Sequence, residues 1–272
     1  MPAEQAGEEN DQLTARELPS LLIGPSQLSG VEEALSTEWL VTNGLGGYAS
    51  STILGVNTRK YHGLLVAAID PPLGRRVLLA KLDEVMVSPS GGRTRLATND
   101  SMSGLDNEGL RSLRSFYLSP FPSFMYDVDG VSLLKTITLA EGENLVLVRY
   151  EAVNLRDESV LLEISPLTSY RGIYTVLNSE RSPWAYDQQV FDRGFAAHLR
   201  DLTLYFAMAS DAAEFSRLGG AWVRRLRYRT DEARGDSYLD DCYVPGHFGI
   251  HLKAGESRLF HLLASASRSK LD

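Results

Sequence analysis

The sequence predicts an all-β protein, a large antiparallel sandwich with few short helices. Short runs of β-branched, Leu and aromatic residues recur from about Ser20 onward, as strands do. Gly, Pro, Asn and Asp separate these runs, which is typical of turns between strands. Convincing helical periodicity is scarce. The spacing of runs and turns therefore favours a large sandwich.

The chain begins with a segment unlike the rest. Residues 1–19 are acidic, contain no aromatic residue and are rich in Ala and Glu. Such a composition cannot bury enough apolar surface to offset the entropy of ordering, so we expect a disordered lead. Residues 20–272 are expected to form the sandwich domain. Its best helix candidate is Ser29 to Ser36, with Ser29 as the cap and Glu32 and Glu33 in the first turn.

The clearest strand pair lies between Val131 and Val153. Leu133, Lys135, Ile137 and Leu139 alternate before a Gly-containing turn at residues 141–144, and a second alternating run follows. Further runs are expected to be strands at His62–Ile69, Val77–Val87, Ser159–Pro166, Ala196–Ser210, Trp222–Thr230, Phe248–Lys253 and Arg258–Ala266. The stretch from Leu105 to Ser123 shows no clear period and is expected to be a long connection.

Charge and cysteine content exclude several classes of function. The chain has 27 Lys and Arg against 35 Asp and Glu, a net charge of −8, which argues against nucleic acid or an acidic membrane as the main partner. The single Cys242 excludes an internal disulfide framework and a cysteine-based zinc site. No apolar run reaches the roughly 18 residues of a membrane span. Because the acidic start is also unlike a signal peptide, we expect a cytoplasmic protein.

The densest feature is the segment Glu38 to Thr52, EWLVTNGLGGYASST, followed by NTRKYHG at 57–63. Gly44, Gly46 and Ala49 satisfy the dinucleotide pattern G-x-G-x-x-G/A after an apolar run. The residues that follow are poor helix formers, however, and a pyrophosphate site needs a helix N-terminus there. A P-loop is excluded because no Gly-Lys-Ser/Thr follows the glycines. Nucleotide binding is therefore not the favoured interpretation.

Two other interpretations of this segment remain open. Asn43-Gly44 is a strong hairpin signal, so the segment can be a tight turn and nothing more. Against this, aromatic and polar side chains crowd the turn, and sugar sites combine flat aromatic faces with amide, guanidinium and imidazole groups. The candidate substrate-binding or domain-facing residues are Trp39, Asn43, Gly44, Gly46, Gly47, Tyr48, Asn57, Arg59, Tyr61 and His62.

Other motifs give weak signals. His247 and His251 have the spacing of a helical metal pair, but Pro and Gly neighbours favour a strand, on which they would lie roughly 13 Å apart. The arginines at 224, 225, 227 and 229 are expected to lie partly on a solvated or partner-facing surface, with Asp231 and Glu232 close enough to neutralise them in part. A Ser-His-Asp site lacks its Gly-x-Ser-x-Gly elbow. Carboxylate clusters at Asp83-Glu84 and at positions 236, 240 and 241 are weak evidence for catalysis. We expect no metal and no cofactor.

Two blocks of the sequence resemble a known family. The first comprises residues 38–63 and RVLLAKLDE at 76–84, and the second comprises EARGD at 232–236, Asp240-Asp241 and PGHF at 245–248. Together they look like the N-terminal domain of bacterial and archaeal glycogen debranching enzymes of the amylo-α-1,6-glucosidase type. The resemblance covers about residues 20–270.

The resemblance implies a sugar-active supersandwich of the galactose-mutarotase-like type, normally followed by an (α/α)₆ barrel that holds the general acid and base. That barrel is absent from these 272 residues, so we expect no catalytic residue here and no hydrolysis by the chain alone. The expected partners are the barrel and an α-glucan, glycogen or limit dextrin, with no nucleic acid and no membrane. In one hypothesis the domain packs on the barrel and helps to shape the glucan site. In the alternative it is an independent carbohydrate-binding or scaffold module.

Overall fold

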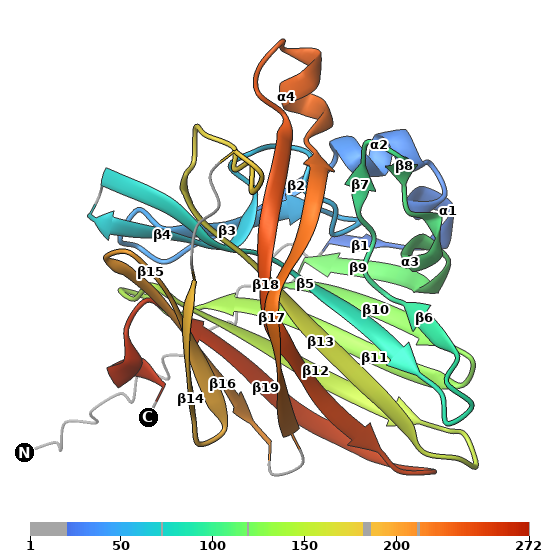
Figure 1. The fold of residues 1–272 in the computed structure, drawn as a ribbon. Coiled ribbons are helices and arrows are strands. Elements are labelled where there is room, and N and C mark those ends of the chain that lie inside the picture. Colours follow the sequence, from blue (N-terminus) through green and yellow to red (C-terminus); the bar gives the residue numbers. More distant parts are fainter. Residues whose placement is uncertain (1–20, 72, 119, 182–185, 211–212, 272) are drawn as a thin grey trace, which may run out of the picture.

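The computed structural model describes residues 21–271, apart from 72, 119, 182–185 and 211–212 (Figure 1). The acidic lead expected at residues 1–19 lies outside the described residues. The described residues form two large antiparallel sheets and a few short helices, which confirms the predicted all-β class.

The first sheet has nine strands in the described chain. In spatial order they are β1 (Leu21–Ile23), β9 (Leu113–Leu118), β10 (Pro122–Val128), β11 (Val131–Leu139), β12 (Leu145–Asn154), β19 (Ser257–Ser265), β16 (Leu202–Ala209), β15 (Gly194–Leu199) and β14 (Asp187–Phe191). The predicted hairpin is confirmed as β11 and β12, whose register runs from Val131 opposite Asn154 to Leu139 opposite Val146.

The second sheet has ten described strands. In spatial order they are β2 (Glu38–Thr42), β3 (Tyr48–Thr52), β4 (Gly63–Asp70), β5 (Leu73–Val87), β13 (Val160–Gly172), β18 (Leu239–Leu252), β17 (Ala213–Arg227), β7 (Asp100–Ser101) and β8 (Gly104–Leu105), with β6 (Arg93–Arg95) paired to β5. The expected strands at 62–69, 77–87 and 159–166 are thus confirmed, with shifted ends.

The hydrophobic core lies between the two sheets. Side chains on β11 alternate between buried and half-buried, so one face of the strand enters the core. Phe116 and Phe124 meet edge to face at 5.0 Å between ring centroids, and Tyr150 stacks on Phe260 at 5.1 Å. All four rings belong to the same buried cluster as residues of the second sheet. Burial of this apolar surface is the main force holding the sheets together.

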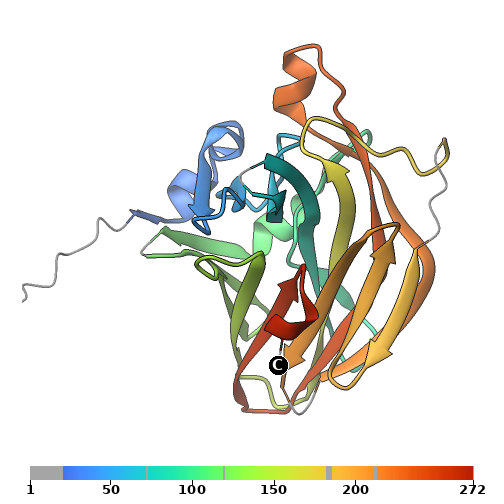
Figure 2. The ribbon, with the colours of Figure 1, turned by 90° about the vertical axis from the view of Figure 1, so that its left-hand side faces the viewer.

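The helices are short and lie outside the sheets. They are α1 (Pro25–Leu28), α2 (Val31–Ser36), α3 (Asn107–Ser112), α4 (Arg229–Ala233) and the 3₁₀ turn η1 (Arg268–Lys270). In the side view, α1 and α2 stand beside the sheets and α4 projects at the top (Figure 2). The expected helix at 29–36 is α2, but its N-cap is Gly30; Ser29 instead ends α1 and donates its hydroxyl to the Ser26 carbonyl at 2.7 Å.

Two expectations about connections were wrong. Residues 105–123 are not a loop, because they contain α3, capped by Asp106, then β9 and the start of β10. The run at 196–210 is a hairpin, since Arg200 takes the left-handed conformation at φ 56° and reverses the chain between β15 and β16. The strands in these two segments form because they pair with neighbouring strands. The residue pattern within each segment does not indicate that pairing.

Strand β18 is longer than the expected run at 248–253 because it continues through Pro245. A proline cannot donate to a strand ladder and is tolerated where pairing is interrupted. The register with β17 shifts between Arg217 and Ala221, and the register with β13 shifts between Ile164 and Thr168. Pro245 lies at both irregularities. His247 and His251 both belong to this strand, as their neighbours indicated.

Candidate functional site

The glycine-rich segment forms the turn between β2 and β3. Gly44 and Gly46 have φ of 77° and 94°, which other residues rarely adopt. The buried Asn43 amide stabilises the turn, since its Oδ1 accepts from the N–H groups of Leu45 and Gly47, each at 3.0 Å. Strand β3 follows directly and no helix does, so the phosphate-binding arrangement does not form.

The same asparagine ties this turn to the other sheet. Its Nδ2 donates to the Glu143 carbonyl at 2.8 Å, and its own carbonyl accepts from Gly142 N–H at 2.7 Å. A Cβ on Gly47 would lie 2.6 Å from Asn43 Nδ2 and 3.0 Å from the Val66 carbonyl. The turn therefore packs against the β11–β12 turn of the other sheet and against β4. Asn43 and Gly47 have structural roles in this packing.

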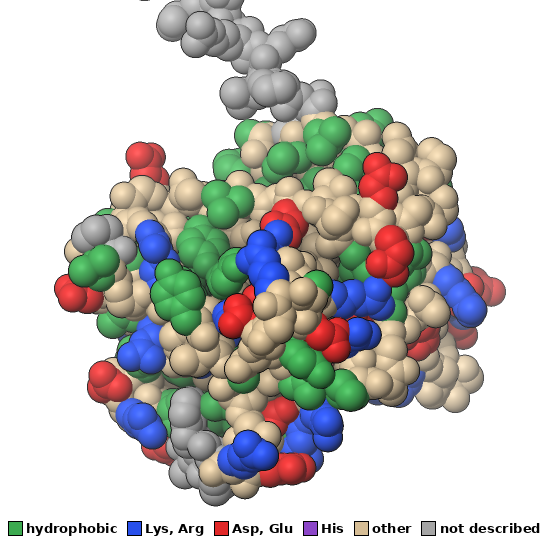
Figure 3. Space-filling view, turned by 90° about the horizontal axis from the view of Figure 1, so that it is seen from above, with side chains coloured by type: hydrophobic (Ala, Val, Ile, Leu, Met, Phe, Trp, Pro, Cys, Tyr) green, Lys and Arg blue, Asp and Glu red, His purple; other side chains and the backbone are tan. Residues whose placement is uncertain are grey.

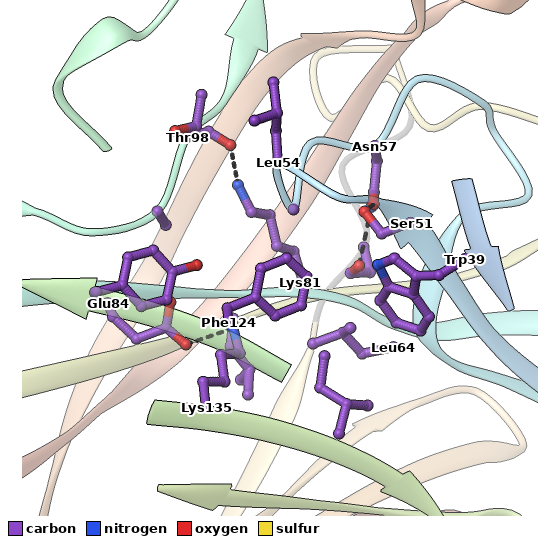
Figure 4. A pocket seen from close by; sticks show the side chains of 16 residues that line it. Trp39, Ser51, Leu54, Asn57, Leu64, Lys81, Glu84, Thr98, Phe124 and Lys135 are labelled. Carbon is purple, nitrogen blue, oxygen red and sulfur yellow. Dashed lines mark hydrogen bonds and ion pairs between the residues drawn. The ribbon is translucent and has the colours of Figure 1, made fainter. Parts of the chain in front are cut away.

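Two further candidates also point inward. Trp39 is 3% exposed and donates its indole N–H to the Thr52 carbonyl at 3.0 Å. Asn57 bridges the Ser51 hydroxyl and the Ala80 carbonyl at 2.8 and 2.9 Å. Both line an internal cavity of about 20 Å³, room for a water molecule, beside the buried Lys81 and Glu84 (Figure 4).

The remaining candidates, of which His62 is buried, lie against the β2–β3 hairpin. The Tyr48 hydroxyl donates to the Tyr61 carbonyl at 2.8 Å, and burial raises the pKa of Tyr48 to about 12. Arg59 Nε donates to Glu38 Oε1 at 2.5 Å, and His62 Nε2 lies 3.6 Å from the same oxygen. The His62 ring and then the Arg59 guanidinium lower the pKa of Glu38 to about 2, although partial burial opposes them.

Segment 57–62 also contacts the tip of the β17–β18 hairpin, which carries α4. Asp231 is fully buried and accepts from Lys60 N–H at 2.6 Å. Asp236 pairs with Lys60 Nζ at 3.2 Å, and Arg234 Nη1 donates to the Tyr61 hydroxyl at 3.0 Å. The two sequence blocks, separated by some 170 residues in these contacts, thus meet at one end of the molecule. We call residues 57–62 and 229–238 the composite end.

Charged and hydrophobic side chains are interleaved on the surface of this end (Figure 3). Leu40 on β2 is 57% exposed, and Tyr174, in the loop that follows β13, is 75% exposed. Of the arginine run, Arg224 and Arg225 are exposed and Arg227 donates to Glu232 at 2.6 Å, as expected. Asp231 does not neutralise these arginines; it is turned inward to Lys60 N–H.

A buried ion pair that no sequence motif indicated lies beneath the composite end. Arg171 on β13 and Asp240 on β18 are 2% and 0% exposed, and Arg171 Nε donates to Asp240 Oδ2 at 2.7 Å. Tyr228 donates to the same oxygen at 2.7 Å, and Leu177 N–H donates to Oδ1 at 2.6 Å. Burial alone would lower the pKa of Arg171, but Asp240 and Tyr228 raise it overall. Arg171 is the second-last residue of β13, a strand that also contains Glu163, Ser165, Thr168 and Ser169, so no pattern in the strand indicated this pair.

Asp241 holds the loop that follows β13 two residues beyond Leu177. Its Oδ2 accepts from the N–H and the hydroxyl of Ser179, each at 2.7 Å. The acidic pair of the second block therefore positions residues 177–179 of the loop that follows β13. In the described part of the chain, no three His, Cys, Asp or Glu side chains gather closely enough to hold a metal ion. Among the described helices, none has the length and apolar character needed to cross a membrane.

Fold and site together define a large two-sheet antiparallel domain with one end assembled from two distant segments. The chain belongs to the family described as glycogen debranching enzyme N terminal, whose sequence model matches residues 37–259. Both segments of the composite end fall within that match, so the resemblance seen in the sequence is confirmed. Comparison with curated protein sequences finds no match.

Comparison with solved structures finds matches at low identity and with TM-scores below 0.5. A bacterial glucoamylase complexed with acarbose is 9% identical with a TM-score of 0.37, and the match covers 88% of this chain and 32% of that one. A putative kojibiose phosphorylase from human microbiome is 8% identical with a TM-score of 0.41, over 90% of this chain and 32% of that one. The chain spans about a third of the length of both proteins.

Proposed function

We propose that this chain is the non-catalytic N-terminal domain of a glycogen debranching α-1,6-glucosidase, which packs on an (α/α)₆ catalytic barrel and helps to shape its glucan site. The observation that carries the proposal is the composite end, where the two blocks typical of the family meet. The identity of the glucan substrate and the presence of a catalytic barrel are inferred from the family.

The chemistry of the composite end supports contact with a partner domain. Polar groups whose orientation is fixed by bonds, such as Arg59 on Glu38 and Arg234 on Tyr61, lose little conformational freedom when they bind. The exposed Leu40 and Tyr174 add apolar area at the same end. Interfaces between domains of one chain combine such polar and apolar groups over about 600–1,500 Å².

The proposal is tested in a protein that carries both this domain and the barrel. Arg59→Ala should lower kcat/KM on a limit dextrin, by about tenfold for each 1.4 kcal/mol of transition-state stabilisation lost. Arg59 is preferable to His62, because His62 is buried and its Nδ1 accepts from Thr58 N–H, so its removal would also disturb the loop.

Arg93→Ala is the matched control, since Arg93 makes a similar ion pair with Glu163 in the β6 region. It should leave kcat/KM unchanged. Wild-type kinetics for Arg59→Ala, or a loss explained by a lower Tm, would contradict the proposal and leave the segment a structural turn. If either of these results is obtained and the isolated chain also binds glucan, the alternative of an independent carbohydrate-binding module is favoured.

A further inference from the structure

A polar pocket lies between the loop that follows β13 and the β17–β18 hairpin. Its volume is about 350 Å³, within the range of about 300–1,000 Å³ that small-molecule sites occupy. One wall is the loop between Leu177 and Arg181, and the other is the hairpin, through Arg224, Arg225 and Asp241. None of these residues belongs to the composite end, so the pocket is a separate feature of the surface.

A β-bulge brings two consecutive arginines to this pocket. The register of β17 with β18 shifts between Val223 and Leu226, so Arg224 and Arg225 together face the single residue Asp241. In a regular strand, neighbouring side chains point to opposite faces of the sheet. A bulge changes the direction of side chains and is common beside functional sites. Here both arginines line the same pocket.

The backbone of Arg225 has an unusual conformation. Its φ is 58°, in the left-handed region that is unfavourable for most residues other than glycine. The N–H of Arg225 donates to Asp241 Oδ1 at 2.8 Å, and this bond holds the conformation. Glycine would adopt it without strain, so the turn itself does not require an arginine. Strained positions that neighbouring groups hold in place are concentrated at functional sites.

Hydrogen bonds fix both walls of the pocket. Asp241 joins them, because it accepts from the N–H and hydroxyl of Ser179 in the loop as well as from Arg225 in the hairpin. Asn178 Oδ1 accepts from two backbone N–H groups of its own turn, at 3.1 and 2.9 Å. Arg224 Nε donates to the Ser179 hydroxyl at 3.2 Å. Walls that are already ordered lose little conformational entropy when a ligand binds.

The lining of the pocket is positive although the chain is negative. Three guanidinium groups, those of Arg181, Arg224 and Arg225, face two carboxylates, those of Glu180 and Asp241, which gives a net charge of +1. The whole chain has a net charge of −8. Both oxygens of Asp241 already accept bonds from the walls. The pocket therefore favours an anionic ligand.

The arginines of this part of the chain differ in their pairing. Arg227, which lies next to the composite end, forms an ion pair with Glu232. Within the described residues, neither Arg224 nor Arg225 forms an ion pair with a carboxylate. Their guanidinium groups are exposed and can take up an oxyanion from solution.

We propose that this pocket binds the phosphate group of a small phosphorylated molecule. A guanidinium group binds phosphate through two parallel N–H···O bonds, and phosphate supplies several strong acceptor oxygens. Arg224 and Arg225 hold the phosphate, and Arg181 closes the site from the loop. Because the pocket is larger than a bare phosphate ion, the rest of the ligand fits beside Asn178. The proposal rests on the pocket alone and does not depend on the proposed function.

The test follows the backbone amide chemical shifts of the chain during a titration with glycerol 3-phosphate at millimolar concentration. The ionic strength is kept constant with sodium chloride, because salt screens charge interactions. Shifts should change at residues 177–181, 224–225 and 239–241. Glycerol, which lacks the phosphate, should cause no change, and inorganic phosphate should bind more weakly than the ester.

Arg225→Gly separates the charge from the fold. Glycine keeps the left-handed conformation and removes the guanidinium group, so the variant should fold and bind glycerol 3-phosphate about tenfold more weakly or worse. Arg225→Lys should retain part of the affinity. Arg217→Ala is the matched control, because it removes the same charge from an exposed position elsewhere on β17 and should leave binding unchanged. If Arg225→Gly does not fold, Arg224→Gln serves the same purpose.

An absence of shifts in the wild type, an equal response to glycerol, or unchanged affinity in folded Arg225→Gly would overturn the proposal. Tighter binding of hexaglutamate than of glycerol 3-phosphate would also overturn it and would favour an acidic protein segment as the ligand. The titrations use this chain alone and a ligand that is not a glucan. A failed Arg59→Ala test would leave their results intact, so the two proposals fail separately.

Discussion

Lys135 shows how a single residue departs from the pattern of its strand. It occupies the buried phase of β11, where an apolar residue is expected, and is 6% exposed. Glu84 on β5 pairs with it at 2.6 Å and also accepts from the Tyr150 hydroxyl at 2.7 Å. Alternation predicted the strand and the phase of Lys135. It could not predict the partner, which comes from the opposite sheet.

Removing one partner of this buried ion pair should destabilise the fold. Lys135→Met would leave the Glu84 carboxylate buried and unpaired, so the free energy of unfolding should fall by about 3–5 kcal/mol. In the double variant with Glu84→Gln the loss should be smaller, since no charge stays buried. Urea unfolding of the two singles and the double measures the coupling; strictly additive losses would show that the pair does not interact.

Glu38 should make stability depend on pH. Its pKa falls from an ordinary 4.5 to about 2 in the fold. A depressed carboxyl pKa stabilises the folded state above the unfolded value, and that contribution disappears as pH falls from 4.5 through 2. Because the group is partly exposed, the contribution should be about 1 kcal/mol or less.

Urea unfolding across this pH range checks the expectation. Wild type should be more stable than Glu38→Gln near neutral pH, and the difference should shrink as pH falls below 4.5 and vanish once pH is below 2, where the carboxyl is protonated in the folded state as well. Glu33→Gln, at an exposed position on α2, should show no such trend. A constant difference between wild type and Glu38→Gln at every pH would contradict the assignment.

At the scale of elements, the sequence predicted strands wherever alternation and turn residues coincide, as in β11 and β12. It missed α3 and β9, because pairing with β10 and β1 selects the strand there and the segment has no period of its own. It predicted the crowding of polar groups near 57–62 but not the contact with α4. Contacts such as Lys60 with Asp231 join residues 171 positions apart, which a single sequence does not reveal.

The close approach of β17 to β18 should make Gly246 irreplaceable. A Cβ there would lie 2.3 Å from the Ser216 carbonyl and 2.6 Å from the Phe215 ring. Gly246→Ala should therefore lower the free energy of unfolding by about 1–3 kcal/mol. Gly219→Ala, on the same hairpin with no atom within 4 Å of the added Cβ, is the matched control and should change it little. Equal melting temperatures for both variants would contradict the packing argument.

At the scale of the molecule, the composite end joins two sequence blocks that are far apart along the chain. Clustered carboxylates are engaged in structural contacts: Glu84 with Lys135, Asp240 with Arg171, and Asp241 with Ser179. These groups hold strands and loops together.

The isolated chain should consequently release no glucose from a limit dextrin. Glycoside hydrolysis needs two carboxyl groups on either side of one bond, and the buried carboxylates named above are bound to their neighbours. The assay compares the purified chain with a mock purification from the same host. Turnover above that background would mean that carboxylates of this chain catalyse, and the non-catalytic assignment would be wrong.

The central claim, that the composite end packs on a catalytic barrel, is tested most directly by amide hydrogen exchange. The comparison is between the isolated chain and a protein that joins it to the barrel. Exchange should slow at residues 57–62 and 229–238, and it should stay unchanged in the turns at 88–92 and 155–159, which follow β5 and β12. Protection of those turns, with none at the composite end, would contradict the account.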